Sequence, residues 1–367
     1  DEEGNGQWNT LEQVKLASNS SQMVEIGADV SAEWVRVVSD KSTQATAHFF
    51  YTDEDDRAKQ ADAMYTGLAT ADQSKAIGGL LYGLGDNRRA LGISAIHFDG
   101  QDQQNVGYYE LDSALRLIPK KDGETLSFIN EKFAVPEQVV TVEPSSVLIV
   151  DDLGRRWRLP LGKEEYTTLT NQSSLRIDRE VATERDLMNM HGTFYELPAE
   201  NADGFAKIRP ISSHNYRIHD YASYRGLLVM TGIDSTVTSK NEHIIRSEDG
   251  KAAVWVGAID DLWKLGKPTG RGGPWKNTSV KAGKVSDPYL IGFYDQRSLR
   301  LSHTSEQAVT FTIEVEPVGH GPWMTYQEVS VAPGETFEHQ FPNHFQSRWI
   351  RFKSSKDCVA TAWLEYR

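Results

Sequence analysis

The sequence predicts an all-β protein built from repeated antiparallel meanders. Short segments that alternate apolar and polar residues recur along the chain, most of them bounded by Gly, Asp, Asn or Pro. Aromatic residues make up 10% of the chain, with 14 Tyr and 9 Trp, and this enrichment is typical of β-structure. The two ends of the chain also carry copies of one internal repeat. Together these observations favour an extended β scaffold.

The repeat aligns residues 6–51 with residues 321–366 without a gap, at a constant offset of 315 residues. Each copy alternates in the manner of strands separated by short Ser- and Lys-containing turns. The identical pairs include two tryptophans, Trp8 with Trp323 and Trp34 with Trp349. Chance does not preserve such pairs in one register, so we interpret the two segments as related structural units.

The offset suggests how the units are arranged. It equals seven times 45, and one four-stranded blade of a β-propeller takes about 40–50 residues. We therefore predict one β-propeller domain over residues 1–367, with seven antiparallel four-stranded blades. The similar units at 1–52 and 316–367 would close the ring as first and last blades. Two related β-sandwich modules that flank another region are the alternative.

The interior of the chain supports this class. No strand–helix alternation or phosphate-binding Gly-rich loop is present. Two short stretches, 56–64 and 184–188, could be helical, and the Gly-rich stretch 266–279 is expected to be an exposed, flexible loop. Strand candidates follow at meander spacing: 77–82, 90–96, 106–111, 139–142, 147–150, 156–159, 226–231, 253–259, 289–293, 298–302, 309–315 and 326–331.

Charge and composition exclude several classes of partner. The formal net charge of −13 disfavours nucleic acid, because phosphate binding requires a basic surface. No apolar run has the length of a membrane span, so we expect no membrane partner. The single cysteine, Cys358, excludes an internal disulfide and a multi-thiolate metal site. An acidic, aromatic-rich chain with one cysteine would suit a periplasmic or secreted bacterial protein.

Residues 191–225 concentrate chemically versatile side chains. This window of 35 residues holds three of the ten histidines of the chain, with four tyrosines and three arginines. Its members are His191, His214 and His219, then Tyr195, Tyr216, Tyr221 and Tyr224, then Arg209, Arg217 and Arg225.

Three interpretations of this window remain open. The first is β-elimination at a uronic acid, in which Arg neutralises the carboxylate, His removes the α-proton and Tyr protonates the leaving oxygen. The second is a divalent metal, Zn or Ca, held by the three histidines in a structural role. In the third, Tyr and Arg pack as cation–π pairs and His caps turns.

A second group of residues suggests glycoside hydrolysis. That reaction commonly needs a carboxylic acid and a carboxylate about 5–10 Å apart. The candidate carboxylates are Asp260, Asp261 and Asp287, with Glu196 or Asp220 as partners. Aromatic and basic residues near them have the character of a sugar-binding surface: Trp263, Trp275, Tyr289, Lys264, Arg271 and Lys276. Asp before Pro or at a strand end is also an ordinary turn residue.

The grouping of His, Tyr and Arg on repeated meanders resembles the seven-bladed β-propeller polysaccharide lyases, such as ulvan lyases and rhamnose–glucuronate-cleaving enzymes. The resemblance covers architecture and residue types. It implies cleavage of an acidic polysaccharide by β-elimination. The implied base is His191 or His214, the implied acid is Tyr195, Tyr221 or Tyr224, and the implied carboxylate partner is Arg209 or Arg225. Arg217 and His219 would contact substrate, and a structural metal is possible in the family.

Our leading hypothesis from sequence is therefore a carbohydrate-active lyase that acts on an anionic glycan. A glycoside hydrolase that uses an Asp/Glu pair on the same scaffold is the first alternative. A non-catalytic propeller that binds glycan or protein is the second.

Overall fold

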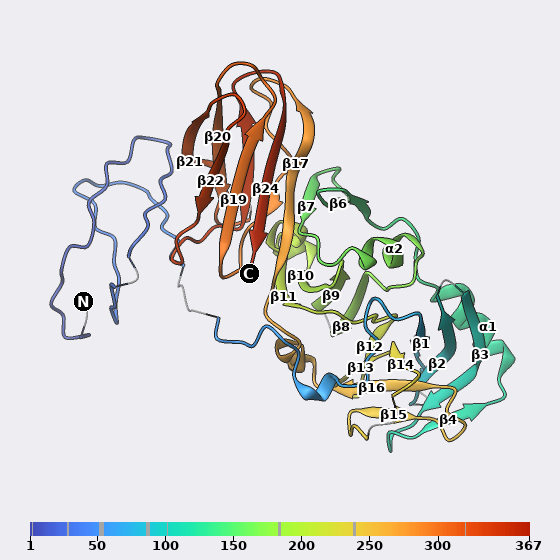
Figure 1. Cartoon of the computed structure of the whole chain (residues 1–367). Coiled ribbons are helices and arrows are strands. Elements are labelled where there is room, and N and C mark those ends of the chain that lie inside the picture. Colours follow the sequence, from blue (N-terminus) through green and yellow to red (C-terminus); the bar gives the residue numbers. More distant parts are fainter. Residues whose placement is uncertain are drawn as a thin grey trace.

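The computed structural model describes residues 1, 3–27, 29–50, 55–85, 89–100, 102–182, 185–237, 240–319 and 321–367. Strands dominate these ranges and helices are few and short, so the predicted all-β class is confirmed. Figure 1 shows an N-terminal segment without strands, a C-terminal pair of stacked sheets, and a group of smaller sheets between them in sequence.

The first sheet has five antiparallel strands in the order β14-β1-β2-β3-β4. β1 and β2 are buried over most of their length. Helix α1 packs on one face through Ile129, and strands β12, β13 and β16 pack on the other. The strands are β1 (Lys75–Gly83), β2 (Leu91–Asp99), β3 (Asp102–Leu111), β4 (Leu117–Lys120) and β14 (Ile233–Asp234).

Two four-stranded antiparallel sheets share a second core, with orders β11-β10-β9-β8 and β12-β13-β16-β15. Leu187 and Phe194 from the first pack with Tyr221 and Trp255 from the second. The strands of the first are β8 (Asp178–Ala182), β9 (Arg185–Met190), β10 (Thr193–Pro198) and β11 (Arg209–Ser213). Those of the second are β12 (Tyr221–Tyr224), β13 (Leu227–Met230), β15 (Ile244–Arg246) and β16 (Ala253–Gly257).

These three sheets meet at the fully buried Asp220. Leu81 on β1 donates its N–H to the Asp220 carboxylate at 2.8 Å, and Arg179 on β8 donates from Nη1 at 2.9 Å. Asp220 itself directly precedes β12 and accepts the N–H of Tyr221. Strands β1, β8 and β12, one from each sheet, therefore come together at this carboxylate.

The C-terminal part is a β-sandwich of two antiparallel layers, β17-β24-β19-β22 and β21-β20-β23-β18. Leu301 and Leu364 of the first layer and Phe311 and Phe352 of the second are fully buried in one core. The strands are β17 (Gly270–Val280), β18 (Tyr289–Leu290), β19 (Arg297–His303), β20 (Val309–Glu316), β21 (Met324–Val331), β22 (Thr336–Gln340), β23 (Trp349–Ser354) and β24 (Cys358–Tyr366).

One layer of the sandwich continues toward the rest of the molecule. β18 pairs in parallel with β7, which extends that layer by three strands. These are β5 (Thr141–Glu143), β6 (Ser146–Val150) and β7 (Arg156–Leu159). The core of the sandwich is therefore continuous with residues from β6, β7 and β10.

The structure differs from the predicted blade over residues 316–367. The strands β21 and β23 belong to one layer of the sandwich, and β22 and β24 belong to the other. None of these four described strands pairs with another of the four: β21 pairs with β20, β22 with β19, β23 with β18 and β20, and β24 with β17 and β19. The repeat unit is therefore half of a sandwich, and the pattern of alternation could not distinguish this from one sheet.

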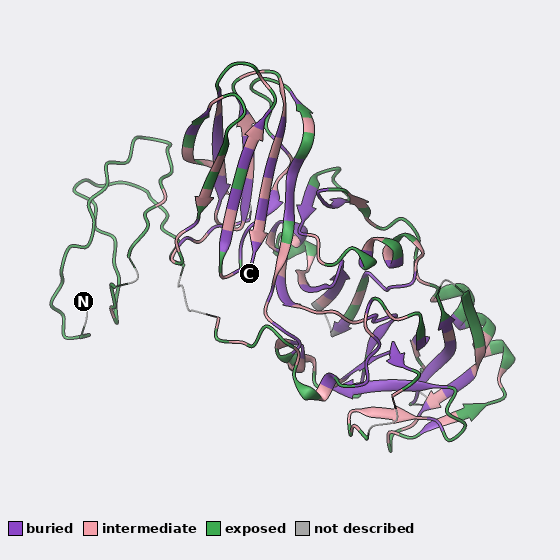
Figure 2. Ribbon diagram, viewed as in Figure 1, coloured by how far each residue is buried: buried purple, intermediate pink, exposed green. Residues whose placement is uncertain are grey.

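The other copy of the repeat forms no strand in its described residues, which are 1, 3–27 and 29–50. Figure 2 shows this segment almost entirely exposed, at one side of the sandwich. Two of its residues contact the sandwich. Met23 packs against the core of the sandwich, and Oε2 of Glu25 lies 3.5 Å from Nε2 of His344.

Short helices connect the strands. The helices are η1 (Ala63–Tyr65), α1 (Gly123–Lys132), α2 (Glu165–Asn171), η2 (Glu200–Ala202), η3 (Gly204–Lys207) and η4 (Ile259–Lys264). Neither α1 nor α2 was predicted from the sequence, and the alternation in the chain did not indicate either. The sequence pattern also suggested a helix at 184–188, but β9 begins there at Arg185. A second helix was suggested at 56–64, and the structure has only the single turn η1 at the end of that stretch. Within the described residues, none of these helices is long and apolar enough to cross a membrane.

The stretch 266–279, predicted to be a flexible loop, contains most of the long strand β17. Its glycines permit close packing of backbones. A Cβ on Gly273 would lie 1.8 Å from the carbonyl oxygen of Ala362, and one on Gly272 would lie 2.2 Å from that of Ser145. The composition that suggested flexibility therefore reflects contact with β24 and with the β5–β6 turn.

Candidate functional site

His191 occupies the turn between β9 and β10, with a left-handed φ of 48°. Its Nδ1 accepts the N–H of Gly162 at 2.9 Å, so Nε2 carries the proton and donates to Oγ1 of Thr167 at 3.1 Å. This tautomer is assigned from the backbone donor. Both ring nitrogens are therefore engaged within the protein.

His214 follows β11 and is engaged in the same manner. Its Nδ1 accepts the N–H of Tyr216 at 3.1 Å, and Nε2 donates to Oδ1 of Asn189 at 3.1 Å. The rings of Phe194 and Tyr166 enclose it at centroid distances of 5.3 and 6.0 Å. The contacts hold the neutral imidazole in a largely apolar site.

Burial lowers the pKa of both histidines. The pKa of His191 falls to about 4 and that of His214 to about 3, because desolvation disfavours the imidazolium ion. Both rings are neutral at pH 7 and have no nitrogen free for a substrate proton. This geometry suits turn-fixing residues, and the role of either as a catalytic base stays a prediction from sequence.

Neutral burial of His214 makes a prediction for stability. The unfolded chain binds a proton at His214 below about pH 6.5, whereas the folded state does so only near pH 3. Stability therefore falls as the pH drops through this window, by up to about 1.4 kcal/mol per pH unit for this group. Urea denaturation at pH 7, 6 and 5 should show a shallower fall for His214→Gln than for the wild type. Equal slopes would contradict the assignment.

His219 and Arg217 lie beside Phe98 on β2. Nδ1 of His219 donates to the carbonyl of Ser174 at 2.8 Å, and Nε2 has no partner among the described residues. The guanidinium of Arg217 lies 4.4 Å from the ring centroid of Phe98, and burial lowers the pKa of this arginine. Both side chains are nearly fully buried, so the structure gives neither the surface expected of a substrate contact.

Asp220 is neutralised by two arginines. Arg176 donates from Nε at 2.9 Å and Arg179 from Nη1 at 2.9 Å. Burial alone would raise the pKa of this carboxyl, but the two guanidinium groups outweigh burial and hold the pKa below its ordinary value. Asp220 is thus a permanent carboxylate in an Arg–Asp–Arg network.

The predicted tyrosines are mostly internal. Tyr195 is fully buried, and desolvation raises its pKa to about 12. Tyr221 donates its hydroxyl to the carbonyl of Leu187 at 2.7 Å. Tyr224 donates to the carbonyl of Arg89 at 2.7 Å, and its neighbour Arg225 is exposed in the turn before β13. The structure therefore does not bring these tyrosines together with the histidines at one accessible surface.

One predicted arginine, one carboxylate and one tryptophan do lie together. Arg209 on β11 pairs with Glu196 on β10, and its guanidinium lies 5.7 Å from the ring centroid of Trp263. Arg57 covers the same indole at 4.6 Å. All are partly buried. Both guanidinium groups already lie against this indole, so the cluster has the features of a packed junction.

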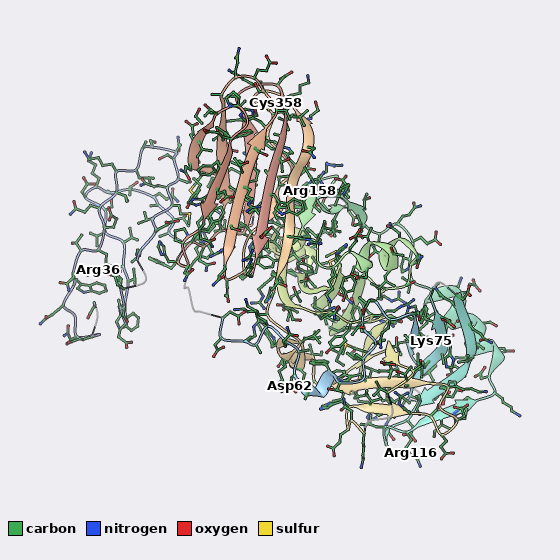
Figure 3. The ribbon with its side chains drawn as sticks, viewed as in Figure 1. Arg36, Asp62, Lys75, Arg116, Arg158 and Cys358 are labelled. Atoms are coloured by element: carbon green, nitrogen blue, oxygen red, sulfur yellow. The ribbon has the colours of Figure 1, made fainter. Side chains whose placement is uncertain are left out.

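Two of the remaining carboxylate candidates, Asp261 and Asp287, have structural partners. Asp261 in η4 accepts the N–H of Ala258 at 2.8 Å and the ammonium of Lys264 at 2.9 Å, and Asp260 lies beside it in the same helix. Asp287 binds Arg158 at 2.8 Å and Arg156 at 3.2 Å. Figure 3 shows Arg158 where β7 meets the sandwich.

Two aromatic residues predicted to bind sugar belong to the core. Trp275 on β17 packs against Phe311 and Phe352, and Tyr289 on β18 is fully buried. Neither presents a ring face to solvent.

Three carboxylates that were not predicted from the sequence lie on the β8–β9 ladder. Glu180 and Asp186 are direct partners across the ladder, and Asp178 precedes Glu180 by two residues. Partners and residues two apart share one face of a sheet, so all three carboxylates lie on one face. The sequence shows acidic residues at the alternate positions 178 and 180, which could have indicated this face. The pairing with Asp186 depends on how β8 and β9 align and cannot be read from the sequence.

Asp178 combines exposure with a perturbed pKa. Its side chain reaches solvent, and no cation of the described residues pairs with it or with Asp186. Desolvation by the surrounding protein, followed by the charge of Asp186, raises the pKa of Asp178 to about 6. Burial and the charge of Glu180 raise the pKa of Asp186 as well. A carboxyl of this kind is protonated in mildly acidic solution and can donate a proton.

Among the described residues, no group of three His, Cys, Asp or Glu side chains is arranged to hold a metal ion. The three predicted histidines are separately engaged, as set out above. The structural metal therefore stays an expectation from the resemblance.

No protein-family model matches this sequence, and no curated protein matches it significantly. Among solved structures, PirA is similar at 16% identity and a TM-score of 0.16, over 27% of this chain and 84% of PirA. A family 43 arabinoxylan arabinofuranohydrolase from Bacillus subtilis is similar at 12% identity and a TM-score of 0.19, over 79% of both chains. A family 32 β-fructofuranosidase from Bombyx mori is similar at 10% identity and a TM-score of 0.15, over 80% of both chains. Scores this low establish neither a shared fold nor a shared activity.

Proposed function

We propose that this protein is a glycoside hydrolase, built on a propeller-like group of sheets, that cleaves glycosidic bonds with the carboxyl groups of Asp178 and Asp186. The observation that supports this is their placement on one accessible face of the β8–β9 ladder without a cationic partner among the described residues. Of the candidate carboxylates predicted from sequence, Asp220, Asp261, Asp287 and Glu196 are each paired with Lys or Arg. Asp260 lies in the short helix η4, away from the β8–β9 ladder.

The spacing of the pair suits this chemistry. Asp178 lies opposite Met188, and Asp186 lies opposite Glu180, so Asp178 and Asp186 are diagonal neighbours. Diagonal neighbours in an antiparallel ladder have Cα atoms about 7–8 Å apart. Carboxyl pairs of glycoside hydrolases are separated by about 5–10 Å. The two groups can therefore flank one glycosidic bond.

The proposed roles follow from the two environments. Asp178 donates its proton to the glycosidic oxygen while the bond from that oxygen to the anomeric carbon breaks. Asp186 accepts a proton from the water that attacks the anomeric carbon. Because the pKa of Asp178 is about 6, the acid form is lost as the pH rises above this value. Activity should therefore decline from pH 6 to pH 8.

The test is hydrolysis of a panel of neutral and uronic-acid-containing glycans, followed by new reducing ends and by absorbance near 235 nm. We expect reducing ends without absorbance, and a loss of about a hundredfold in kcat for Asp178→Asn. Asp357→Asn is the matched control, because Asp357 is exposed next to Cys358 at the far end of the sandwich (Figure 3). It should retain full activity.

Other outcomes would overturn the proposal. Absorbance near 235 nm would report the unsaturated product of β-elimination and favour the lyase predicted from sequence, with His191 and His214 as the residues to substitute. Glycan binding without either product would identify a binding module. Full activity of both Asp178→Asn and Asp186→Asn would place hydrolysis elsewhere.

A further inference from the structure

The N-terminal segment, residues 1–50, reproduces the local geometry of the second half of the sandwich. In that half, the guanidinium of Arg351 on β23 lies 4.1 Å from the ring centroid of Trp323. The repeat equivalents, Arg36 and Trp8, make the same cation–π contact at 3.9 Å. Figure 3 places Arg36 in the segment apart from the sheets. A contact between residues that are 28 apart is thus preserved without a sheet.

The turns agree as well. Equivalent hydrogen bonds recur at the offset of 315 residues, and so does one left-handed turn position. The matched pairs are Gly6 N–H to the Asp1 carboxylate (2.7 Å) with Gly321 N–H to Glu316 (2.8 Å), Ser39 Oγ to Lys41 O (2.8 Å) with Ser354 Oγ to Lys356 O (2.7 Å), and Asn19 (φ 55°) with Gly334 (φ 76°).

Among the residues that the structure describes, no strand pairs with this segment. In the complete sandwich, β21–β24 make all their described pairings with β17, β18, β19 and β20, which lie within residues 270–316. Residues 1–50 correspond to residues 316–365, so they repeat only β21–β24. Because β21–β24 do not pair with one another, the equivalent residues in 1–50 cannot form a sheet among themselves. Their backbone N–H and C=O groups therefore have no neighbouring strand to bond with in the part of the chain that the structure describes.

The segment also exposes the residues that should face a core. Trp34 is 64% exposed and Val37 is 68% exposed, whereas their equivalents Trp349 and Phe352 are 1% and 0% exposed. The same contrast holds for Val14, Leu16, Ile26, Val30, Val35 and Phe49, whose equivalents are Val329, Val331, Phe341, Phe345, Ile350 and Leu364. An apolar set of this size on a surface marks an interaction site.

We propose that residues 1–50 are one half of a second β-sandwich, and that they bind a complementary half with the strand pattern of β17, β18, β19 and β20. The partner is a polypeptide segment that adds strands to both layers, so main-chain hydrogen bonds and alternating apolar residues would recognise it. A second copy of the chain does not supply it, because its own β17–β20 are paired with β21–β24.

The position of the partner strands is fixed by one pairing that is already formed. The N–H of Trp34 donates to the carbonyl of Asp1 at 3.3 Å, just as Trp349 pairs with Glu316 at the end of β20. A strand that corresponds to β20 would therefore end at Asp1. Residues 270–315 placed directly before Asp1 would have the register of the complete sandwich.

The test extends the full chain at its N-terminus with a copy of residues 270–315 and compares amide hydrogen exchange. In the extended chain we expect exchange at residues 34–39 and 43–50 to slow at least a hundredfold relative to the unextended chain. The control carries Phe311→Asp and Ile313→Asp in the added copy alone, which removes two core residues of the added strand. It should show no added protection, while β23 and β24 stay protected in all three chains.

Equal exchange at these residues in the extended and control chains would overturn the proposal. Protection of residues 34–50 in the unextended chain that increases with protein concentration, together with dimer formation in sedimentation, would identify a second copy as the occupant. That result would overturn the complementary half as the partner.

Discussion

Asp220→Asn is expected to lower the free energy of unfolding by about 3–5 kcal/mol, because it removes the buried carboxylate from between the guanidinium groups of the buried Arg176 and the half-buried Arg179. Arg176 and Arg179 would then lie in the interior without a counterion, and the N–H groups of Leu81 and Tyr221 would lose a charged acceptor. Since β1, β8 and β12 meet at this carboxylate, the loss should affect three sheets together.

Guanidinium or urea denaturation followed by circular dichroism measures this change. Asp357→Asn is the control, since its ion pair with Lys281 is exposed and should have no measurable effect. A stability of Asp220→Asn within error of the wild type would mean that the network is hydrated or that the arginines find other partners. Because whole-protein stabilities are about 5–15 kcal/mol, the expected loss is a large share of the total.

Trp349→Ala is expected to cost about 3–5 kcal/mol, because it opens a cavity in the core of the sandwich. The indole is 1% exposed, lies 4.7 Å from the ring of Trp157 and donates Nε1–H to the carbonyl of Ala206 at 2.7 Å. The substitution would therefore remove packing and leave a buried carbonyl without its donor.

Trp34→Ala is the matched control, because the same residue type occupies the equivalent repeat position at 64% exposure. It should leave the unfolding transition unchanged. Similar losses for the two variants, measured by urea denaturation, would show that residues 1–50 already have a packed core in the isolated chain.

Helix α1 shows why part of the fold could not be predicted from the sequence. α1 begins after Asp122, whose carboxylate accepts the N–H of Thr125 at 3.0 Å, and it buries only Ile129 fully. Its single buried contact gives little apolar periodicity, so the pattern around Asp-Gly resembles a hairpin turn. Packing against β1 and β2 stabilises the helix, and this packing is not visible in its own residues.

The site shows the same limit for chemistry. The density of His, Tyr and Arg in residues 191–225 suggested a functional region, but density does not tell whether a side chain faces solvent. The polar atoms of His214 and Tyr221 form hydrogen bonds with backbone and side-chain groups inside the protein. Asp178 and Asp186 were not predicted as a site, because their proximity depends on the register between β8 and β9.

The sequence by itself determined the all-β class, about half of the strand positions and the repeat shared by the two ends, because alternation and repetition are local properties of a chain. Only the tertiary structure decided that the repeat is half of a sandwich, that the Gly-rich stretch is a strand packed against β24, and which carboxylates have no cationic partner among the described residues. Those facts depend on which strands pair and which faces are covered. Pairing between distant residues is set by the whole fold, and no short segment encodes it alone.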